Sequence, residues 1–152
     1  MISCSFAGHR ELYGRNIDSQ IESAIENILK KDSSFVFYSG DMGEFDSMCS
    51  SAVRKAKWQH PELDIKLIVV LPYMMTKVNT HKEQYERLYD EIIIPMELSE
   101  AHYKSAISKR NRWIVDRIDC LIAYVYRDFG GAYATLNYAY QMKKDIINLA
   151  DI

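Results

Sequence analysis

The chain has 152 residues, of which 48% are hydrophobic and 26% charged, and its formal net charge is −2. This length and composition are typical of one globular domain with a substantial hydrophobic core. A slightly acidic chain without a basic tail is poorly suited to non-specific duplex binding, because such binding neutralises phosphates with clustered Lys and Arg.

Apolar runs typical of strands alternate with amphipathic helical patterns along the chain. In chain order, we expect a strand at 2–7, a helix at 16–30, a strand at 34–39, a helix at 44–58, a strand at 65–71, a helix at 80–89, a short strand at 91–96, a helix at 103–118, a strand at 119–126, a helix at 135–143 and a strand at 146–149. Apart from Lys66, the run at 65–71 consists of Ile, Leu and Val, as in strands covered on both faces of a parallel sheet. Pro95 places the 91–96 strand at an edge.

The repeated strand–helix pattern predicts an α/β fold: a single domain over residues 1–152, with a mostly parallel sheet and helices on both faces. In such folds ligands bind beyond the carboxyl ends of the strands, where the strand order reverses. The loops expected at that edge are 8–10, 39–46, 71–73 and 127–135. We therefore group these four loops as one candidate site.

Two of these loops join a strand to a helix through glycines. Gly40 and Gly43 lie in the first, and Gly130 and Gly131 in the second. Such a junction directs free backbone N–H groups and the positive end of a helix dipole at one point, which favours an anion. Two junctions in one domain favour a nucleotide-sized ligand. Thr135 adds a hydroxyl at the expected start of a helix, or serves as its N-cap.

The loop after the first strand carries Gly8, His9 and Arg10. The planar guanidinium of Arg10 suits phosphate. His9 is suited to donate to a phosphate or to carry a proton near neutral pH. The alternative for both side chains is an exposed turn without a binding role.

Three acidic residues lie in the first glycine loop: Asp41, Glu44 and Asp46. Carboxylates repel phosphate, and they suit ribose hydroxyls or base amines instead. The alternative is a structural role at the start of the following helix, where the dipole favours acids. We take all three as candidate ligand contacts.

The 103–118 helix has its apolar residues Tyr103, Ile107, Ile114 and Ile118 on one stripe. The same helix carries Arg110 and Arg112, which do not share a face. At most one of the two is expected to point at the site, and Arg112 is among the candidate contacts. The alternative is a solvated polar face.

Cysteine and histidine usage argues against a metal site. Cys4, Cys49 and Cys120 are too few and too scattered for a disulfide framework, and we expect buried free thiols. His60, His81 and His102 lack metal-ligand spacing. The first residues do not resemble a signal peptide, and no apolar run is long enough to span a membrane. We expect a cytoplasmic protein with no metal, no cofactor and no membrane partner.

Taken together, several segments resemble the YpsA-like branch of the SLOG superfamily, which joins the Rossmann-like domains of the DNA-processing protein A type with the Lonely Guy proteins. The similarity spans nearly the whole chain. Its motifs are Ser5-Phe-Ala-Gly-His-Arg10, Ser39-Gly-Asp-Met-Gly-Glu-Phe-Asp46, Asp119-Cys-Leu-Ile-Ala-Tyr124, Gly130-Gly131, Thr135-Leu-Asn-Tyr-Ala139 and Ile146-Ile-Asn-Leu149.

The resemblance implies a Rossmann-like domain that binds nucleotides or nucleotide derivatives, including NAD-derived species. Carried over by position, the matching residues are Gly8, His9 and Arg10, then Gly40, Gly43 and Asp46, then Gly130, Gly131 and Thr135. Lonely Guy enzymes hydrolyse the base–ribose bond with a signature similar to PGGxGTxxE and an arginine on the upstream helix. In this chain Phe129 stands where the signature has proline, the loop is one residue longer before the threonine, and the glutamate is missing.

The leading expectation is therefore a binding protein, a sensor or sequestering module for a nucleotide or an NAD-derived nucleotide. The alternative is an N-glycosidase acting on such a ligand, in which Glu44 or Asp46 supplies the missing carboxylate. A third reading is single-stranded DNA binding, against which the acidic balance weighs. Eleven tyrosines exceed what a core of this size uses, so we also expect a homo-oligomer.

Overall fold

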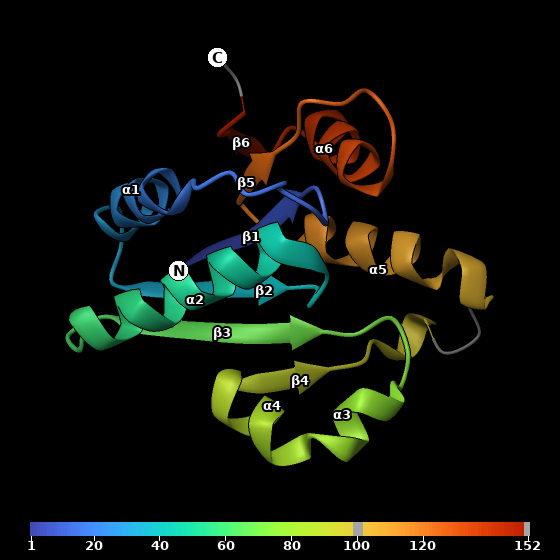
Figure 1. The fold of residues 1–152 in the computed structure, drawn as a ribbon. Helices are drawn as coiled ribbons and strands as arrows, with labels where there is room; N and C mark the ends of the chain where they lie inside the picture. The colour runs from blue at the N-terminus through green and yellow to red at the C-terminus, as the bar shows by residue number, and fades with distance from the viewer. Residues whose placement is uncertain (99–101, 151–152) are drawn as a thin grey trace.

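The computed structural model describes residues 1–98 and 102–150. Its strands are β1 (Ile2–Gly8), β2 (Ser34–Ser39), β3 (Asp64–Val70), β4 (Glu91–Ile93), β5 (Cys120–Tyr124) and β6 (Asp145–Asn148). Its helices are α1 (Asp18–Leu29), α2 (Gly43–Gln59), α3 (Thr76–Thr80), α4 (Lys82–Leu88), α5 (Tyr103–Arg117) and α6 (Gly131–Gln141), with a 3-10 turn, η1, at Met96–Leu98. The alternation of strands and helices confirms the α/β prediction (Figure 1).

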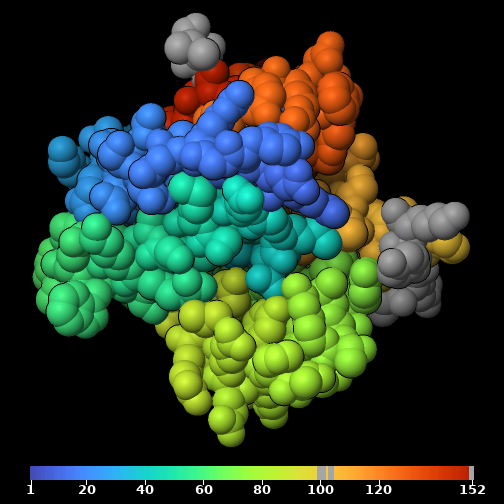
Figure 2. Space-filling view, in the orientation of Figure 1, coloured from blue at the N-terminus to red at the C-terminus, as the bar shows by residue number. Residues whose placement is uncertain are grey.

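The six strands form one parallel sheet in the order β4-β3-β2-β1-β5-β6. The chain builds outward from β1 to β4 and then crosses back to place β5 on the other side of β1. The strand order therefore reverses between β1 and β5. In the register of these two neighbouring strands, Cys4 lies opposite Cys120. Figure 2 shows the segment after β1 (blue) lying between the start of α2 (teal) and α6 (orange).

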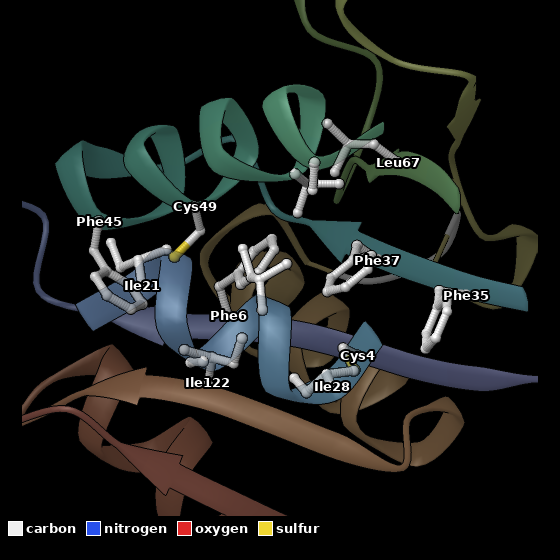
Figure 3. Packing of buried hydrophobic residues seen from close by; sticks show 14 of the residues in the cluster. Cys4, Phe6, Ile21, Ile28, Phe35, Phe37, Phe45, Cys49, Leu67 and Ile122 are labelled. Atoms are coloured by element: carbon white, nitrogen blue, oxygen red, sulfur yellow. The ribbon is translucent and has the colours of Figure 1, made fainter. Parts of the chain in front are cut away.

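Alternating strand residues divide the core into two layers. Phe35 and Phe37 of β2 belong to the layer under α1 and α2, whereas Val36 belongs to the layer under α5 and α6. Figure 3 shows Ile21 and Ile28 of α1 packed with the strand residues of the first layer. Both faces of the sheet are thus covered by helices, as the apolar run at 67–70 of β3 predicts. Cys4, Cys49 and Cys120 are buried free thiols, as expected.

Three elements differ from the prediction. The helix expected at 80–89 is α4 alone, and an unexpected short helix, α3, precedes it, because the backbone breaks at His81 (φ −114°, ψ 37°) between the two. β4 ends at Ile93, and the chain after Pro95 continues as η1 rather than as strand. α6 begins at Gly131 instead of Thr135, since Gly130 alone adopts a positive φ and Gly131 is already helical. Within the described residues, no helix is both long and apolar enough to cross a membrane.

Candidate functional site

A cleft of about 380 Å³ opens at the carboxyl ends of β1, β2 and β5, at the point where the strand order reverses. Its walls come from the loops after these strands, from the first turns of α6 and from α5. This is the position that the topology predicts for a ligand site. Three of the four grouped loops line the cleft, while residues 71–73 of the fourth do not.

The cleft brings together most of the predicted site residues. Those among its lining residues are Gly8, His9, Arg10, Gly40, Asp46, Gly130, Gly131 and Thr135. Those outside the lining are Asp41, Gly43, Glu44 and Arg112. The structure explains the placement of each group.

The loops after β1 and β2 are docked against each other. The N–H of Glu44 donates to the backbone oxygen of Arg10 across 2.8 Å, and Glu44 Oε2 accepts the N–H of Leu12 across 3.0 Å. Gly43 allows this approach, because its φ is +85° and a Cβ there would lie 2.6 Å from the Arg10 Cα. Gly43 and Glu44 therefore support the loop after β1, which lines the cleft, without lining the cleft themselves.

Asp46 is the organising residue of the loop after β2. Its Oδ1 accepts the Ser39 hydroxyl across 2.8 Å, and its Oδ2 accepts the N–H groups of Gly40 and Met42 across 3.0 and 3.1 Å. Burial raises the pKa of Asp46, while these donors and Arg110 act in the opposite direction. Two backbone N–H groups and one hydroxyl of the same loop are therefore fixed by a single carboxyl group.

Asp41 points away from the cleft. Tyr85 donates its hydroxyl to Asp41 Oδ2 across 2.6 Å, and Lys77 Nζ lies 3.1 Å from the same oxygen. Asp41 also has a positive φ of 55°. Its carboxylate thus links the loop after β2 to α3 and α4.

Arg110, rather than Arg112, faces the cleft. Arg110 is 1% exposed, and its Nη1 donates to the backbone oxygens of Gly40 and Val70, each across 2.9 Å. Burial lowers its pKa, with Asp46 and Asp41 opposing that shift. Arg112 is exposed instead and lies 5.1 Å above the Tyr138 ring. Of the two arginines, Arg110 and not Arg112 is therefore a lining residue of the cleft.

Two guanidinium groups converge on one thioether at the cleft. Nη2 of Arg10 and Nη2 of Arg110 each lie 3.5 Å from Met42 Sδ. A thioether sulfur is a weak hydrogen-bond acceptor. The two arginines therefore present strong donors next to a partner that a better acceptor would replace.

The N-terminus of α6 opens on the same cleft. Its N-cap is Gly130, which supplies no side-chain hydrogen bond to the first N–H groups of the helix. Gly131 and Ala132 of the first turn line the cleft. Thr135 lies one turn inside the helix and donates its hydroxyl to the Gly131 oxygen across 2.9 Å, so it is not the N-cap.

His9 is a structural link as well as a lining residue. It is 7% exposed, and its Nε2 accepts the backbone N–H of Tyr126 across 3.2 Å. Burial lowers the pKa of His9, and Arg127 and Arg15 lower it further. The ring is therefore neutral near pH 7, with its proton on Nδ1.

Several lining residues were not predicted. Tyr13, Arg127 and Phe129 stand at the mouth of the cleft, and Met42 lies between the two arginines. Arg110 had a usable signal, since it fills the gap between Ile107 and Ile114 on the apolar stripe of α5. For Arg127 and Phe129 the sequence offered no signal beyond their place in the 127–135 loop, and for Tyr13 it offered none.

Three solved structures have a similar fold. DNA processing protein A from Streptococcus pneumoniae matches 99% of this chain with a TM-score of 0.66 at 17% identity. The Helicobacter pylori protein of the same name, described for its single-stranded DNA binding mode, matches 95% with a TM-score of 0.63 at 16% identity. TM1055 matches 99% with a TM-score of 0.61 at 12% identity.

This chain spans 52% and 63% of the two DNA processing protein A chains and 79% of TM1055. At these identities the likeness establishes a shared Rossmann-like fold. No protein-family model matches the sequence, and no curated protein sequence matches it either.

Proposed function

We propose that this chain is a SLOG-type protein of the YpsA-like branch that binds a nucleotide or an NAD-derived nucleotide in the cleft, as a sensor or sequestering module. One observation carries the proposal. Arg10 and Arg110 direct their Nη2 groups at the weakly accepting Met42 sulfur, in a cleft that the N-terminus of α6 also lines. A phosphate accepts from guanidinium far better than a thioether does.

The other features of the cleft fit an anionic ligand of moderate size. The first N–H groups of α6 have no side-chain cap, and a helix N-terminus favours a negative group. The volume of about 380 Å³ falls within the range of small-molecule sites. We therefore place the phosphate of the ligand beside Gly131, within reach of Arg10.

Binding without chemical conversion is favoured by the state of Glu44 and Asp46, the two carboxylates that the N-glycosidase alternative would use. Glu44 lies outside the lining, and both oxygens of Asp46 already accept hydrogen bonds from its own loop. A general acid or base has to be free to exchange a proton with the substrate. Neither carboxylate has that freedom in this arrangement.

The test is calorimetric titration with AMP, ADP-ribose and NAD. We expect binding tighter than about millimolar by the parent protein and at least a tenfold loss in Gly131→Asp, because the new carboxylate opposes the phosphate. A Cβ at Gly131 meets no atom within 4 Å, so the variant should fold. Gly131→Asn is the matched neutral control. Equal affinities in all three proteins would reject the proposal.

An N-glycosidase is the second candidate, supported by Asp46 lining the cleft with a pKa that burial raises. Incubation with nucleoside monophosphates and NAD, followed by chromatography for free base, tests it. Base release that persists in Glu44→Gln and disappears in Asp46→Asn, with the variant shown to be folded, would replace binding by hydrolysis as the function.

Single-stranded DNA binding is the third candidate, because one of the similar structures is described for that activity. Gel shifts with oligothymidylate at increasing salt test it, since phosphate contacts by Lys and Arg make affinity fall with ionic strength. Self-association and a cytoplasmic location also remain predictions. Sedimentation of the purified protein tests the first.

A further inference from the structure

Tyr13 occupies a backbone position that suits it poorly. Tyr13 and Gly14 form the centre of a tight turn, with φ values of 52° and 77°, closed by the Arg15 N–H donating to the Leu12 oxygen across 3.1 Å. Such turns favour Asn, Asp or Gly, and a bulky residue at positive φ carries a free-energy cost. The Tyr13 side chain is 67% exposed, so core packing does not offset that cost.

Phe129 stands at the mouth of the cleft from the other loop. Its side chain is 66% exposed, and it directly precedes Gly130 and the N-terminus of α6. Both Phe129 and Tyr13 are lining residues of the cleft. Two exposed aromatic side chains, that of Tyr13 on a strained backbone and that of Phe129, therefore line the same cleft.

Arg127 joins the two rings. Its guanidinium lies 5.9 Å from the centroid of Tyr13 and 6.0 Å from that of Phe129. It also lies 5.2 Å from the Tyr126 ring, which His9 contacts edge-on at 4.5 Å. The mouth thus consists of flat aromatic and guanidinium surfaces, the groups on which nucleic-acid bases stack.

We propose that Tyr13 and Phe129 form a clamp, with Arg127 as a third flat surface, that stacks the base of a bound nucleotide. The inference rests on the proposed function, because it takes the phosphate to lie at the adjacent N-terminus of α6. It narrows the ligand class to nucleotides with a free aromatic base and excludes simple sugar phosphates. Stacking tolerates different bases, so the clamp selects for a base rather than for a particular one.

The experiment compares AMP, CMP and ribose 5-phosphate by calorimetry. In the parent protein we expect AMP to bind about tenfold or more tightly than ribose 5-phosphate, with CMP between them. In the double variant Tyr13→Asn with Phe129→Ala, that ratio falls towards one while the affinity for ribose 5-phosphate is unchanged. Tyr140→Ala, which removes an exposed tyrosine outside the cleft lining, is the control and keeps the parent ratio.

Folding is checked on the single variant Tyr13→Asn, whose urea midpoint should equal or exceed that of the parent, because Asn tolerates positive φ. A lower midpoint would remove the strain argument and count against the clamp.

The outcomes separate the two proposals. If AMP and ribose 5-phosphate bind equally, or if the double variant keeps the parent ratio, the clamp is wrong and nucleotide binding stands. If none of the three ligands binds, the clamp is wrong, and the proposed function fails as well if ADP-ribose and NAD also do not bind. If only oligothymidylate binds, and the double variant no longer binds it, these aromatic residues bind single-stranded DNA and the clamp for free nucleotides is wrong.

Discussion

His9 Nε2 accepts the backbone N–H of Tyr126, which ties the loop after β1 to the loop after β5 across the reversal of the strand order. The bond requires a neutral imidazole, because a protonated ring has no acceptor nitrogen. Two of the loops that line the cleft are therefore joined by a hydrogen bond that is lost when the imidazole is protonated on acidification.

Stability should fall on acidification because of His9. Its pKa in the folded protein lies below the ordinary value of about 6.5, lowered by burial and by Arg127 and Arg15. The unfolded chain therefore binds the proton first, so stability that is fully present above pH 6.5 is lost as the pH falls from there to the lower pKa of the folded protein. Thermal unfolding between pH 7.5 and 5.5 measures the slope.

The variant His9→Gln, which keeps an acceptor but does not titrate, should show a flatter slope. The pH dependence that His60 contributes to stability has the opposite sign. Glu26 raises the pKa of His60, so its stabilising contribution is lost as the pH rises. His60→Gln should therefore steepen the acid loss. Identical slopes for the parent and His9→Gln would contradict the assignment.

Arg110→Met should destabilise the fold by about 2 kcal/mol, because the Gly40 and Val70 oxygens each lose a charged donor in a buried site. Removing the buried charge offsets part of that loss. Arg112→Met, on the same helix, should cost less than about 1 kcal/mol, since it removes only an exposed contact with Tyr138. Urea denaturation measures both, and equal effects would refute the distinction.

Asp46→Asn should cost about 2–3 kcal/mol, because an amide cannot accept the N–H groups of Gly40 and Met42 together with the Ser39 hydroxyl. Glu44→Gln should cost less than about 1 kcal/mol, since its oxygen can still accept the Leu12 N–H. The comparison uses unfolding midpoints with circular dichroism as a check of native structure. The reverse order of effects would make Glu44 the organising acid.

Gly43→Ala should destabilise by more than about 2 kcal/mol, because its φ is positive and the added Cβ meets the backbone of Arg10 at 2.6 Å. Gly131→Ala should instead stabilise by about 0.5 kcal/mol, since it lies in helical backbone with open space around its Cβ. Thermal melts of the two variants give opposite shifts. A shift of the same sign in both would show that the loop after β2 tolerates a side chain.

The order of strands and helices could be predicted because each strand has an apolar run and each long helix an apolar stripe. The apolar run at 65–71 corresponds to β3 at Asp64–Val70, a shift of one residue. α3 itself, with the sequence Thr-Lys-Val-Asn-Thr, has one apolar residue, Val78, and therefore shows no apolar stripe that would reveal it. Short helices such as α3 and α4 depend on tertiary contacts, which local patterns do not contain.

The grouping of distant loops could also be predicted, because parallel strands place their carboxyl ends at one edge. The orientation of side chains within the loops could not. Asp41 and Asp46 are five positions apart, yet one binds Tyr85 outside the cleft and the other lines it. That difference depends on the positive φ at Asp41, which a sequence pattern does not reveal.

The outermost strands of the sheet are short: β4 has three residues and β6 has four. A sheet edge of that length offers few unpaired backbone groups to another chain, which limits aggregation by strand addition. If two copies assemble, their contact would therefore be made by side chains on helices and loops, and the sheet of each copy would end where it does in the single chain.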